Sequence, residues 1–503
     1  MRKILIGSLC ILFASALAVA QDTDPSKDFA ATITKDDLHD YLSILASDAL
    51  EGRETGERGQ KMAATFIASH FQELGLQGPV KGGDHQGHFQ KVVLYTSKPG
   101  EIYIKTKKAT MNNFEDVVYY GQGATQGEKA AEIVFVGAGT EENFKNVDVK
   151  GKAVLAVVDG TRAWRGPAQL ATENGASMFF VVNTKTDEEF TGLADQLKHY
   201  LSGGRLSVNK PEASDAGGVF FVKPSMAASI FKKDTEELME AVTDPSSIKK
   251  ADLSYNISVS VDEMYTENVL GYLEGSDLKD ELVVLTAHYD HVGVDGEEVY
   301  NGADDDGSGT SAVMEIAEAF VEAKKAGKGP RRSMLFMLVT GEEKGLLGSE
   351  YYAANPIFPL ENTIVDLNID MIGRIDPEHK ENPNYVYLVG SDRLSTELHE
   401  ISEKVNETYT QFDLDYTYND ENHPDRIYYR SDHWNFAKNN VPIIFYFNGV
   451  HEDYHQPSDT IDKIEFELLT KRTKLVYHTA WVLANRDQRP TVDKLQDQKL
   501  NNN

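Results

Sequence analysis

Histidine and aspartate residues gather in one stretch of this chain, residues 282–309, LVVLTAHYDHVGVDGEEVYNGADDDGSG. The apolar run at 282–285 predicts a buried strand of a parallel sheet, and it leads into His288 and Asp290. A loop then brings three aspartates, residues 304–306, to glycines that open an amphipathic helix. Adjacent carboxylates repel one another unless a cation or a proton lies among them. The stretch therefore indicates a metal site at the carboxyl end of a strand, where open α/β sheets bind ligands.

Further candidate ligands follow the next predicted strands. The apolar runs at 334–339 and 364–369 end at Glu342-Glu343 and at Asp370, and the run at 441–447 precedes HEDYH. Because the carboxyl ends of parallel strands share one edge of a sheet, we expect these side chains to converge. Each of them alone has an ordinary structural explanation, such as a helix cap or a solvated glutamate. Together they form a set without thiolates that suits two zinc ions bridged by one carboxylate: His288, Asp305, Glu343, Asp370 and a histidine at 451–455.

The elements that must position these residues alternate between apolar strands and helical patterns. This alternation predicts a doubly wound α/β fold, with a mostly parallel sheet flanked by helices. From about residue 97 to 255 the pattern changes to short β-rich runs separated by glycine and charged residues. We therefore expect a catalytic domain in two parts, 21–96 and 256–485, interrupted by a β-rich insert at 97–255 and followed by a disordered polar tail at 486–503.

Composition narrows the class of protein. A chain of 503 residues with a net charge of −30 and 41% hydrophobic residues is typical of a soluble protein of two or three domains. The negative charge argues against nucleic acid and anionic membrane surfaces as partners. Arg2 and Lys3, the apolar run at 4–18 and the small residues at 18–20 predict a signal peptide over residues 1–20, and hence a secreted or periplasmic protein. No later run approaches the length of a membrane span.

The only cysteine, Cys10, lies inside the predicted signal peptide. The mature chain would then have no disulfide, no thiolate ligand and no cysteine nucleophile. Three other hydrolase patterns fit less well. HEDYH matches the H-E-x-x-H motif of one-zinc proteases, but Gly449 before it and Pro457 after it predict a loop instead of the required helix. HYDH lacks the first histidine of the metallo-β-lactamase motif, where Thr286 stands, and G-x-S-x-G is absent.

Five motifs of the chain occur in the order of a known family: HYDH with GADDDGSG, then GEEKGLLGS, NIDMIGR, YRSDHWNFA and HEDYHQPSDT. The chain resembles the two-zinc aminopeptidase family, which also includes glutamate carboxypeptidase-like and glutaminyl cyclase-like members. The resemblance covers the N-terminal helices with LASDALEGRETGERG, and residues 256 to about 485. Within 97–255, VDVKGKAVLAVVDG and ENGASMFFVVN resemble a protease-associated domain.

The resemblance implies a metal ligand set of two Zn²⁺ ions. Asp305 would be the bridging ligand, His288 and Asp370 would complete one site, and Glu343 and His455 would complete the other. It also implies a cis peptide bond between Asp305 and Asp306.

The same resemblance implies roles for three further residues. Glu342 would be the general base that takes a proton from a water shared by the two zinc ions. Asp290 would be the carboxylate that orients His288. Tyr454 would help to polarise the substrate carbonyl. Arg430, Asp432 and His433 lie in one of the shared motifs, and their role, functional or structural, stays open.

The implied function is a secreted zinc-dependent exopeptidase acting on peptides, with aminopeptidase as the leading interpretation. A carboxypeptidase or dipeptidase of the same family remains an alternative, in which Arg430 would grip a terminal carboxylate. A glutaminyl cyclase normally uses one zinc, so the five-ligand set counts against it. A non-catalytic binding protein on the same scaffold is disfavoured by the intact ligands and Glu342. The preferred substrate residue, the peptide length, the role of the insert and the oligomeric state are left open.

Overall fold

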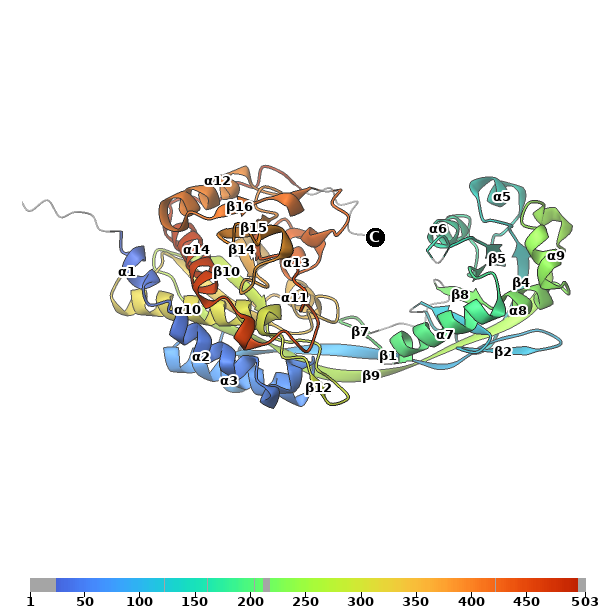
Figure 1. The fold of residues 1–503 in the computed structure, drawn as a ribbon, viewed down its shortest axis with the longest axis horizontal. Coiled ribbons are helices and arrows are strands. Elements are labelled where there is room, and N and C mark those ends of the chain that lie inside the picture. The colour runs from blue at the N-terminus through green and yellow to red at the C-terminus, as the bar shows by residue number, and fades with distance from the viewer. Residues whose placement is uncertain are drawn as a thin grey trace, which may run out of the picture.

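Two lobes joined by a long β-ribbon make up the protein (Figure 1). The computed structural model describes residues 24–495 apart from residues 122, 161, 203, 211–217 and 421, so the signal peptide expected over 1–20 lies outside the described residues. The ribbon consists of β1 (Phe89–Lys105) and β9 (Ala251–Leu273), which pair antiparallel from Phe89↔Val269 to Lys105↔Ser254. Both strands extend from the larger lobe into the smaller one (Figure 1).

The larger lobe is built on a mixed, mostly parallel sheet. Its strand order is β16-β15-β17-β14-β10-β13-β9, and the central neighbours β13, β10, β14 and β17 run parallel to one another. Its strands are β10 (Leu278–His288), β13 (Arg332–Val339), β14 (Thr363–Ile369), β15 (Tyr385–Val389), β16 (Asp413–Asp415) and β17 (Ile443–Phe447), and β11 (Val294–Asp295) and β12 (Glu298–Val299) form a separate hairpin. The predicted α/β class is confirmed.

Helices cover both faces of this sheet. The lobe's helices are α1 (Ser26–Ala30), α2 (Lys35–Leu45), α3 (Arg58–Leu74), α4 (Asp84–Gly87), α10 (Gly309–Lys325), α11 (Leu347–Ala354), α12 (Thr396–Val405), α13 (His433–Ala437) and α14 (Phe466–Asn485). Alternate residues of a strand point to opposite faces, so Val283 and Leu285 pack in the core with α2, α3, α10 and α14, whereas Val284 packs with α11 and α13. A sheet buried on both faces requires continuous apolar runs, as the sequence shows.

Helix α2 begins directly after Thr34. The Thr34 side chain accepts a hydrogen bond from the backbone N–H of Asp37, as expected of an N-cap.

The smaller lobe continues the same sheet beyond β9 and adds helices of its own. Its strands lie in the order β9-β4-β5-β6-β8-β3, and β4, β5, β6 and β8 run parallel. Its strands are β2 (Thr110–Asn112), β3 (Val117–Tyr120), β4 (Lys129–Phe135), β5 (Ala153–Val157), β6 (Met178–Val182), β7 (Arg205–Ser207) and β8 (Val219–Val222). Its helices are α5 (Glu141–Asn146), α6 (Arg165–Glu173), α7 (Asp187–Ser202), α8 (Pro224–Ile230) and α9 (Thr235–Glu240). Two apolar clusters, one on each face, give this lobe its own core.

Two expectations about segment boundaries differ from the structure. The insert boundaries expected at 96/97 and 255/256 fall inside β1 and β9, which continue through them. The tail expected to be disordered from residue 486 lies against the larger lobe over its described part. Arg489 pairs with Glu281, and the backbone N–H of Asp493 donates to the carbonyl of Leu394. Local sequence does not show either feature, because both depend on contacts with distant residues.

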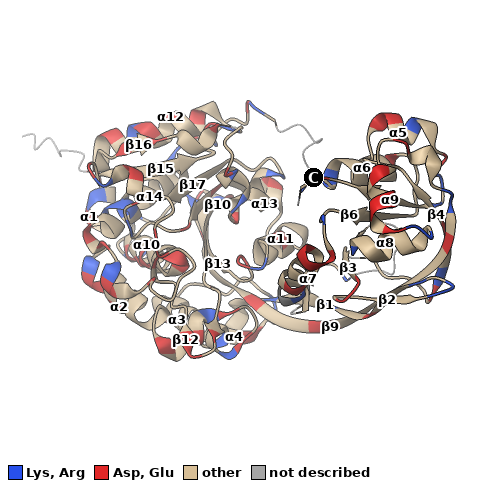
Figure 2. Ribbon diagram, turned by 45° about the vertical axis from the view of Figure 1, so that its right-hand side comes forward, with Lys and Arg blue, Asp and Glu red and all other residues tan. Residues whose placement is uncertain are grey.

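The acidic excess is distributed over the helices and loops of both lobes, with basic residues interspersed (Figure 2). Within the described part of the chain, no helix combines the length and apolar character needed to cross a membrane.

Glu315 on α10 is a buried acid outside the candidate site. Its side chain is 1% exposed, and one of its carboxylate oxygens accepts a hydrogen bond from the Thr34 N–H at 3.3 Å. Burial, with Asp37 and Glu318 nearby, raises the pKa of Glu315 from 4.5 to about 8. The folded protein therefore holds a proton that the unfolded chain loses above pH 4.5.

It follows that ionisation of Glu315 costs stability as the pH rises from 4.5 towards 8. We expect Glu315→Gln to raise the melting temperature at pH 8 and to leave it nearly unchanged at pH 4. The gain should grow by up to roughly 1.4 kcal/mol per pH unit in this window. Thermal unfolding of both proteins at a series of pH values measures the difference. Glu322→Gln, which changes a surface partner of Lys325, is the matched control. A gain that does not depend on pH would contradict the prediction.

Candidate metal centre

The candidate ligands converge at the carboxyl ends of four neighbouring strands. β10 ends at His288, β13 leads to Glu342 and Glu343, β14 leads to Asp370, and the loop after β17 brings His455. These strands are adjacent in the sheet, in the order β17-β14-β10-β13. Residues far apart in the sequence therefore reach one edge of the sheet, which is the crevice position expected for this fold class.

Asp305 lies at the middle of the group. Its Oδ1 atom is 3.3 Å from His288 Nε2, which is also 3.6 Å from Asp370 Oδ1. Its Oδ2 atom is 3.0 Å from His455 Nε2, which is also 3.1 Å from Glu343 Oε2. The two oxygens of one carboxylate thus face two separate sets of donors. This is the arrangement in which one residue can bridge two cations.

Several atoms of this group are buried without a hydrogen-bond partner among the described residues: His288 Nε2, Asp305 Oδ2, Glu343 Oε1, His455 Nε2 and both ring nitrogens of His291. Buried polar atoms are normally satisfied, so unsatisfied atoms that face one another indicate a missing partner. Burial alone would lower the pKa of His455, but Asp305 and Glu343 raise it to about 10. The negative charge of the centre thus favours a bound proton or cation. The imidazole and carboxylate donors, without thiolate, fit zinc.

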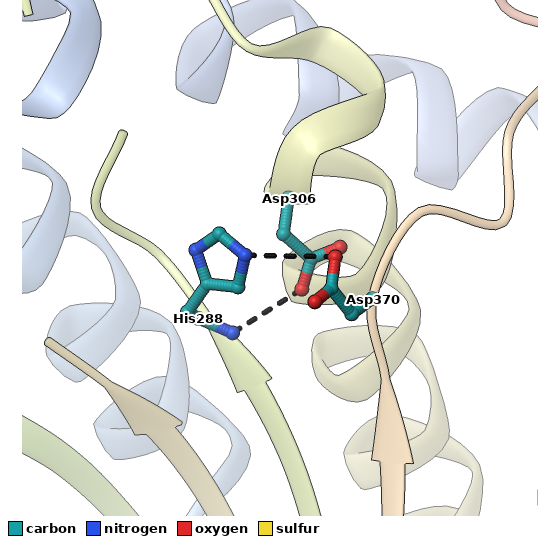
Figure 3. A group of neighbouring side chains, drawn as sticks. All are labelled: His288, Asp306 and Asp370. Atoms are coloured by element: carbon teal, nitrogen blue, oxygen red, sulfur yellow. Dashed lines mark hydrogen bonds and ion pairs between the residues drawn. The ribbon is translucent and has the colours of Figure 1, made fainter. Parts of the chain in front are cut away.

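The carboxylates of the three consecutive aspartates make different contacts. Asp304 accepts a hydrogen bond from the backbone N–H of Gly373 at 2.6 Å and lies 3.1 Å from His451 Nε2. Asp305 faces the candidate ligands. The carboxylate of Asp306 accepts hydrogen bonds from the backbone N–H groups of His288, Gly309 and Met371 at 3.2, 2.9 and 3.1 Å. Figure 3 shows the bond from His288, together with the contact between the His288 ring and Asp370. Asp306 therefore ties β10, α10 and the end of β14 together, whereas Asp305 remains free for metal. The Asp305–Asp306 peptide bond is cis, as the resemblance implied.

His288 is held by a backbone carbonyl. Its Nδ1 atom lies 3.1 Å from the carbonyl oxygen of Asp290, and the Asp290 carboxylate is more distant at 3.9 Å. A proton on Nδ1 leaves Nε2 as the ligating atom. The Asp290 carboxylate instead accepts hydrogen bonds from the Thr55 hydroxyl at 2.7 Å and from the backbone N–H of Glu342 at 3.2 Å. It thus fixes the backbone of the expected base as well as lying near His288.

Glu342 and Tyr454 lie beside the centre. The Glu342 Oε2 atom is 3.9 Å from His288 Nε2. Both residues line a small pocket with Asp305, Asp370, Met371, Ile427, Arg430, Phe445, Phe447 and Val450. Burial, with the carboxylates of Asp305 and Glu343 close by, raises the pKa of Tyr454 and keeps its phenol protonated. The Tyr454 ring stacks on His455, with the ring centroids 3.9 Å apart.

The HEDYH segment is a loop, as predicted, and its two histidines separate. Residues 451–456 form turns with no helical segment, and His455 has a φ of 54°. His451 points to Asp304, whereas His455 points to Asp305 and Glu343. The one-zinc H-E-x-x-H arrangement is therefore absent from this segment.

The structure distinguishes the residues of the YRSDHWNFA motif. Asp432 is fully buried and accepts a hydrogen bond from the Ser349 hydroxyl, and burial raises its pKa to about 7. His433 is buried, with Nε2 2.8 Å from the carbonyl oxygen of Tyr428, and burial lowers its pKa to about 3. These two residues support the fold. Arg430 alone of the three lines the pocket beside the centre.

Sequence reasoning missed two buried residues. His291, three residues after His288, has Nδ1 2.9 Å from Glu343 Oε1 and 3.8 Å from Asp305 Oδ2. The HYDH motif contained this signal, but only its first histidine was interpreted as a ligand. Arg53 is buried, and its guanidinium donates to the carbonyls of Tyr289, Asn301, Gly302 and Leu45. It fastens the N-terminal loop to the aspartate loop, and no local sequence pattern reveals that role.

The chain is similar to known aminopeptidases. Aminopeptidase YwaD of Bacillus subtilis (strain 168) is 24% identical over 514 residues, which cover 99% of this chain and 97% of that protein. A probable leucine aminopeptidase of Arthroderma otae is 30% identical over 213 residues, 41% of this chain and 55% of that protein. The solved aminopeptidase from Aneurinibacillus sp. strain AM-1 has the same fold, with a TM-score of 0.54, 17% identity and coverage of 94% of this chain and 98% of that one.

The model of Peptidase family M28 matches residues 268–480. This segment contains β10, the aspartate loop, β13, β14, β17 and every predicted metal ligand. Over residues 268–480 the chain therefore matches peptidase family M28.

Proposed function

We propose that this chain is a secreted or periplasmic zinc-dependent aminopeptidase that holds two zinc ions and removes N-terminal residues from peptides. The arrangement around Asp305 supports this best: two sets of nitrogen and oxygen donors share one carboxylate, and Glu342 lies next to one of them. The relatives described above are named aminopeptidases. We further propose that 97–255 is a protease-associated domain.

In this proposal Glu342 transfers protons and Tyr454 stabilises the oxyanion. When bound, two zinc ions would acidify a water molecule and polarise the scissile carbonyl. Glu342 accepts the proton of that water and returns it to the leaving amine. Burial raises the pKa of Glu342, as do Asp370 and Glu343, although His288 opposes them. A raised pKa suits a carboxylate that must both take and give a proton near neutral pH. The protonated phenol of Tyr454 can donate a hydrogen bond to the developing oxyanion.

The pocket and the groove beside the candidate metal centre can accommodate the N-terminal part of a peptide. The pocket beside Glu342 has apolar walls, including Met371, Phe445 and Phe447, that can receive the side chain of the residue to be removed. A separate groove of about 800 Å³ begins at Glu343 and continues to Lys98, Tyr119 and Tyr120 on the insert side. We propose that the rest of the peptide follows this groove, so that the insert forms one wall of the approach.

A substrate panel tests the proposed function. Peptides and aminoacyl 4-nitroanilides with a free amine should be cleaved with a kcat/KM about 10²-fold or more above their N-acetylated forms, because burying a polar site without its charged partner costs roughly 3 kcal/mol. Dialysis against a chelator should abolish hydrolysis, and zinc should restore it. Full activity after complete metal removal would contradict the proposal.

The same panel tests the second candidate, a carboxypeptidase or dipeptidase. Arg430 is exposed and lines the pocket beside the centre, where it could bind a terminal carboxylate. In that case N-acetylated peptides with a free C-terminus would be the better substrates, and Arg430→Ala would raise KM for them. Under the aminopeptidase proposal, a C-terminal amide should change kcat/KM little.

The secretion proposal is tested by N-terminal sequencing of the exported protein, which should begin at Gln21.

A further inference from the structure

His291 is a buried histidine whose ring is not held by a well-oriented hydrogen bond within the described part of the chain. Its side chain is 0% exposed, and neither ring nitrogen makes a well-oriented hydrogen bond among the described residues, although Nδ1 lies close to Glu343. A buried imidazole without a well-oriented hydrogen bond at either nitrogen is costly. His88, by contrast, has its Nδ1 atom 2.7 Å from the carbonyl oxygen of Leu270.

The ring of His291 is aimed into the metal centre. Its Nδ1 atom is 2.9 Å from Glu343 Oε1 and 3.8 Å from Asp305 Oδ2. Ligand atoms of these three residues all lie within 4.8 Å of one another. The His455 ring approaches from the other side, with the two ring centroids 5.8 Å apart. His291 Nδ1 and His455 Nε2 thus both lie close to the carboxylates of Glu343 and Asp305.

The position of His291 is fixed by the backbone around it. Its N–H donates to the carbonyl of Arg53 at 3.1 Å. A Cβ atom on Gly302 would lie 2.6 Å from two ring carbons of His291, so the chain keeps a glycine where the ring needs room. The ring therefore has a fixed direction towards Glu343 and Asp305, as a preorganised ligand requires.

We propose that His291 is a sixth metal ligand, which completes a four-donor zinc site with Asp305, Glu343 and His455. The inference rests on the proposed dizinc centre and deepens it, because it makes the two sites unequal. The other set has only three protein donors: His288, Asp305 and Asp370. Structural zinc sites are closed by four protein ligands, whereas catalytic sites keep an open position. The open position thus belongs to the side of His288 and Asp370, where Glu342 also lies.

Zinc affinity is the first test. Wild-type protein equilibrated in zinc buffers should bind two equivalents, one of them more tightly. His291→Ala should weaken the tight equivalent by about 10²-fold or more, since even changes outside the ligand shell cost 10 to 100-fold. His478→Ala is the matched control: it removes another buried histidine with an unpartnered nitrogen, which stacks on Tyr409. The control should bind zinc as the wild type does. Unchanged affinity in a folded His291→Ala protein would overturn the inference.

A crystal structure of the zinc-loaded wild type is the second test, and it does not depend on how the variant folds. Anomalous difference density should place one zinc about 2.0 to 2.1 Å from His291 Nδ1, the normal Zn–N distance. Two zinc ions with His291 beyond ligating distance would refute the sixth ligand and leave the proposed function intact. A wild type that binds no zinc would refute the proposed function itself.

Discussion

Glu342→Gln should lower kcat by about 10³-fold, within the 10² to 10⁴ range typical of general acid–base groups, and leave zinc content unchanged. The substitution keeps the size of the side chain and removes its ability to take a proton. The substitution leaves the candidate ligands around Asp305 unchanged, and the Glu342 carboxylate is 3.9 Å from one of them, His288 Nε2. KM should change little, since the lost interaction acts in the transition state.

Steady-state kinetics with a free-amine substrate, together with metal analysis of the same preparation, checks this expectation. Glu322→Gln provides the control for a glutamate-to-glutamine change at the surface. A variant that keeps wild-type kcat would exclude Glu342 as the base. A variant that loses both zinc and activity would instead show that Glu342 helps to hold the metal.

Asp305→Ala should lose metal and activity together. The carboxylate is the one group that faces both donor sets, at 3.3 Å from His288 Nε2 and 3.0 Å from His455 Nε2. Its removal would deprive each set of donors of a ligand, and the negative charge that offsets the repulsion between two bound cations would be lost. We expect zinc content to fall from two equivalents to below one, and kcat/KM to fall by about 10⁴-fold or more, a loss of at least roughly 5 kcal/mol of transition-state stabilisation.

Inductively coupled plasma mass spectrometry after dialysis measures the zinc content, and circular dichroism confirms that the variant is folded. Asp305→Asn separates charge from shape, because it keeps a single oxygen donor and loses the negative charge. It should retain more zinc than the alanine variant and less than the wild type. A folded Asp305→Ala protein with two tightly bound zinc ions would rule out the bridging role.

The two lobes share the strands β1 and β9, which limits how freely one lobe can move relative to the other. β1 and β9 continue from the sheet of the larger lobe into the smaller one, so the insert is joined to the catalytic sheet by a paired ribbon instead of a flexible linker (Figure 1). The two sides of the groove between Glu343 and Tyr120 therefore belong to lobes that are joined by hydrogen-bonded strands. This favours a defined approach for peptides over a freely swinging cover.

The sequence by itself determined the α/β class and the strand ends at which the site is built. Continuous apolar runs identify strands buried on both faces, and polar residues directly after them must lie at the edge where parallel strands end. His288, Glu343 and Asp370 could be located in this way, because a strand has a fixed direction and period. The general position of the aspartate loop followed from the same argument.

Only the tertiary structure decided which loop residues face the metal centre. Asp304, Asp305 and Asp306 are chemically identical in the sequence. Their roles differ because distant backbone N–H groups hold the carboxylates of Asp304 and Asp306, whereas the Asp305 carboxylate faces His288 and His455. His451 and His455 diverge because His455 adopts a left-handed backbone conformation, with a φ of 54°, that no periodic pattern encodes. Loops lack the regular geometry of strands and helices. The direction of a loop side chain is therefore set by long-range contacts, which a linear sequence does not display.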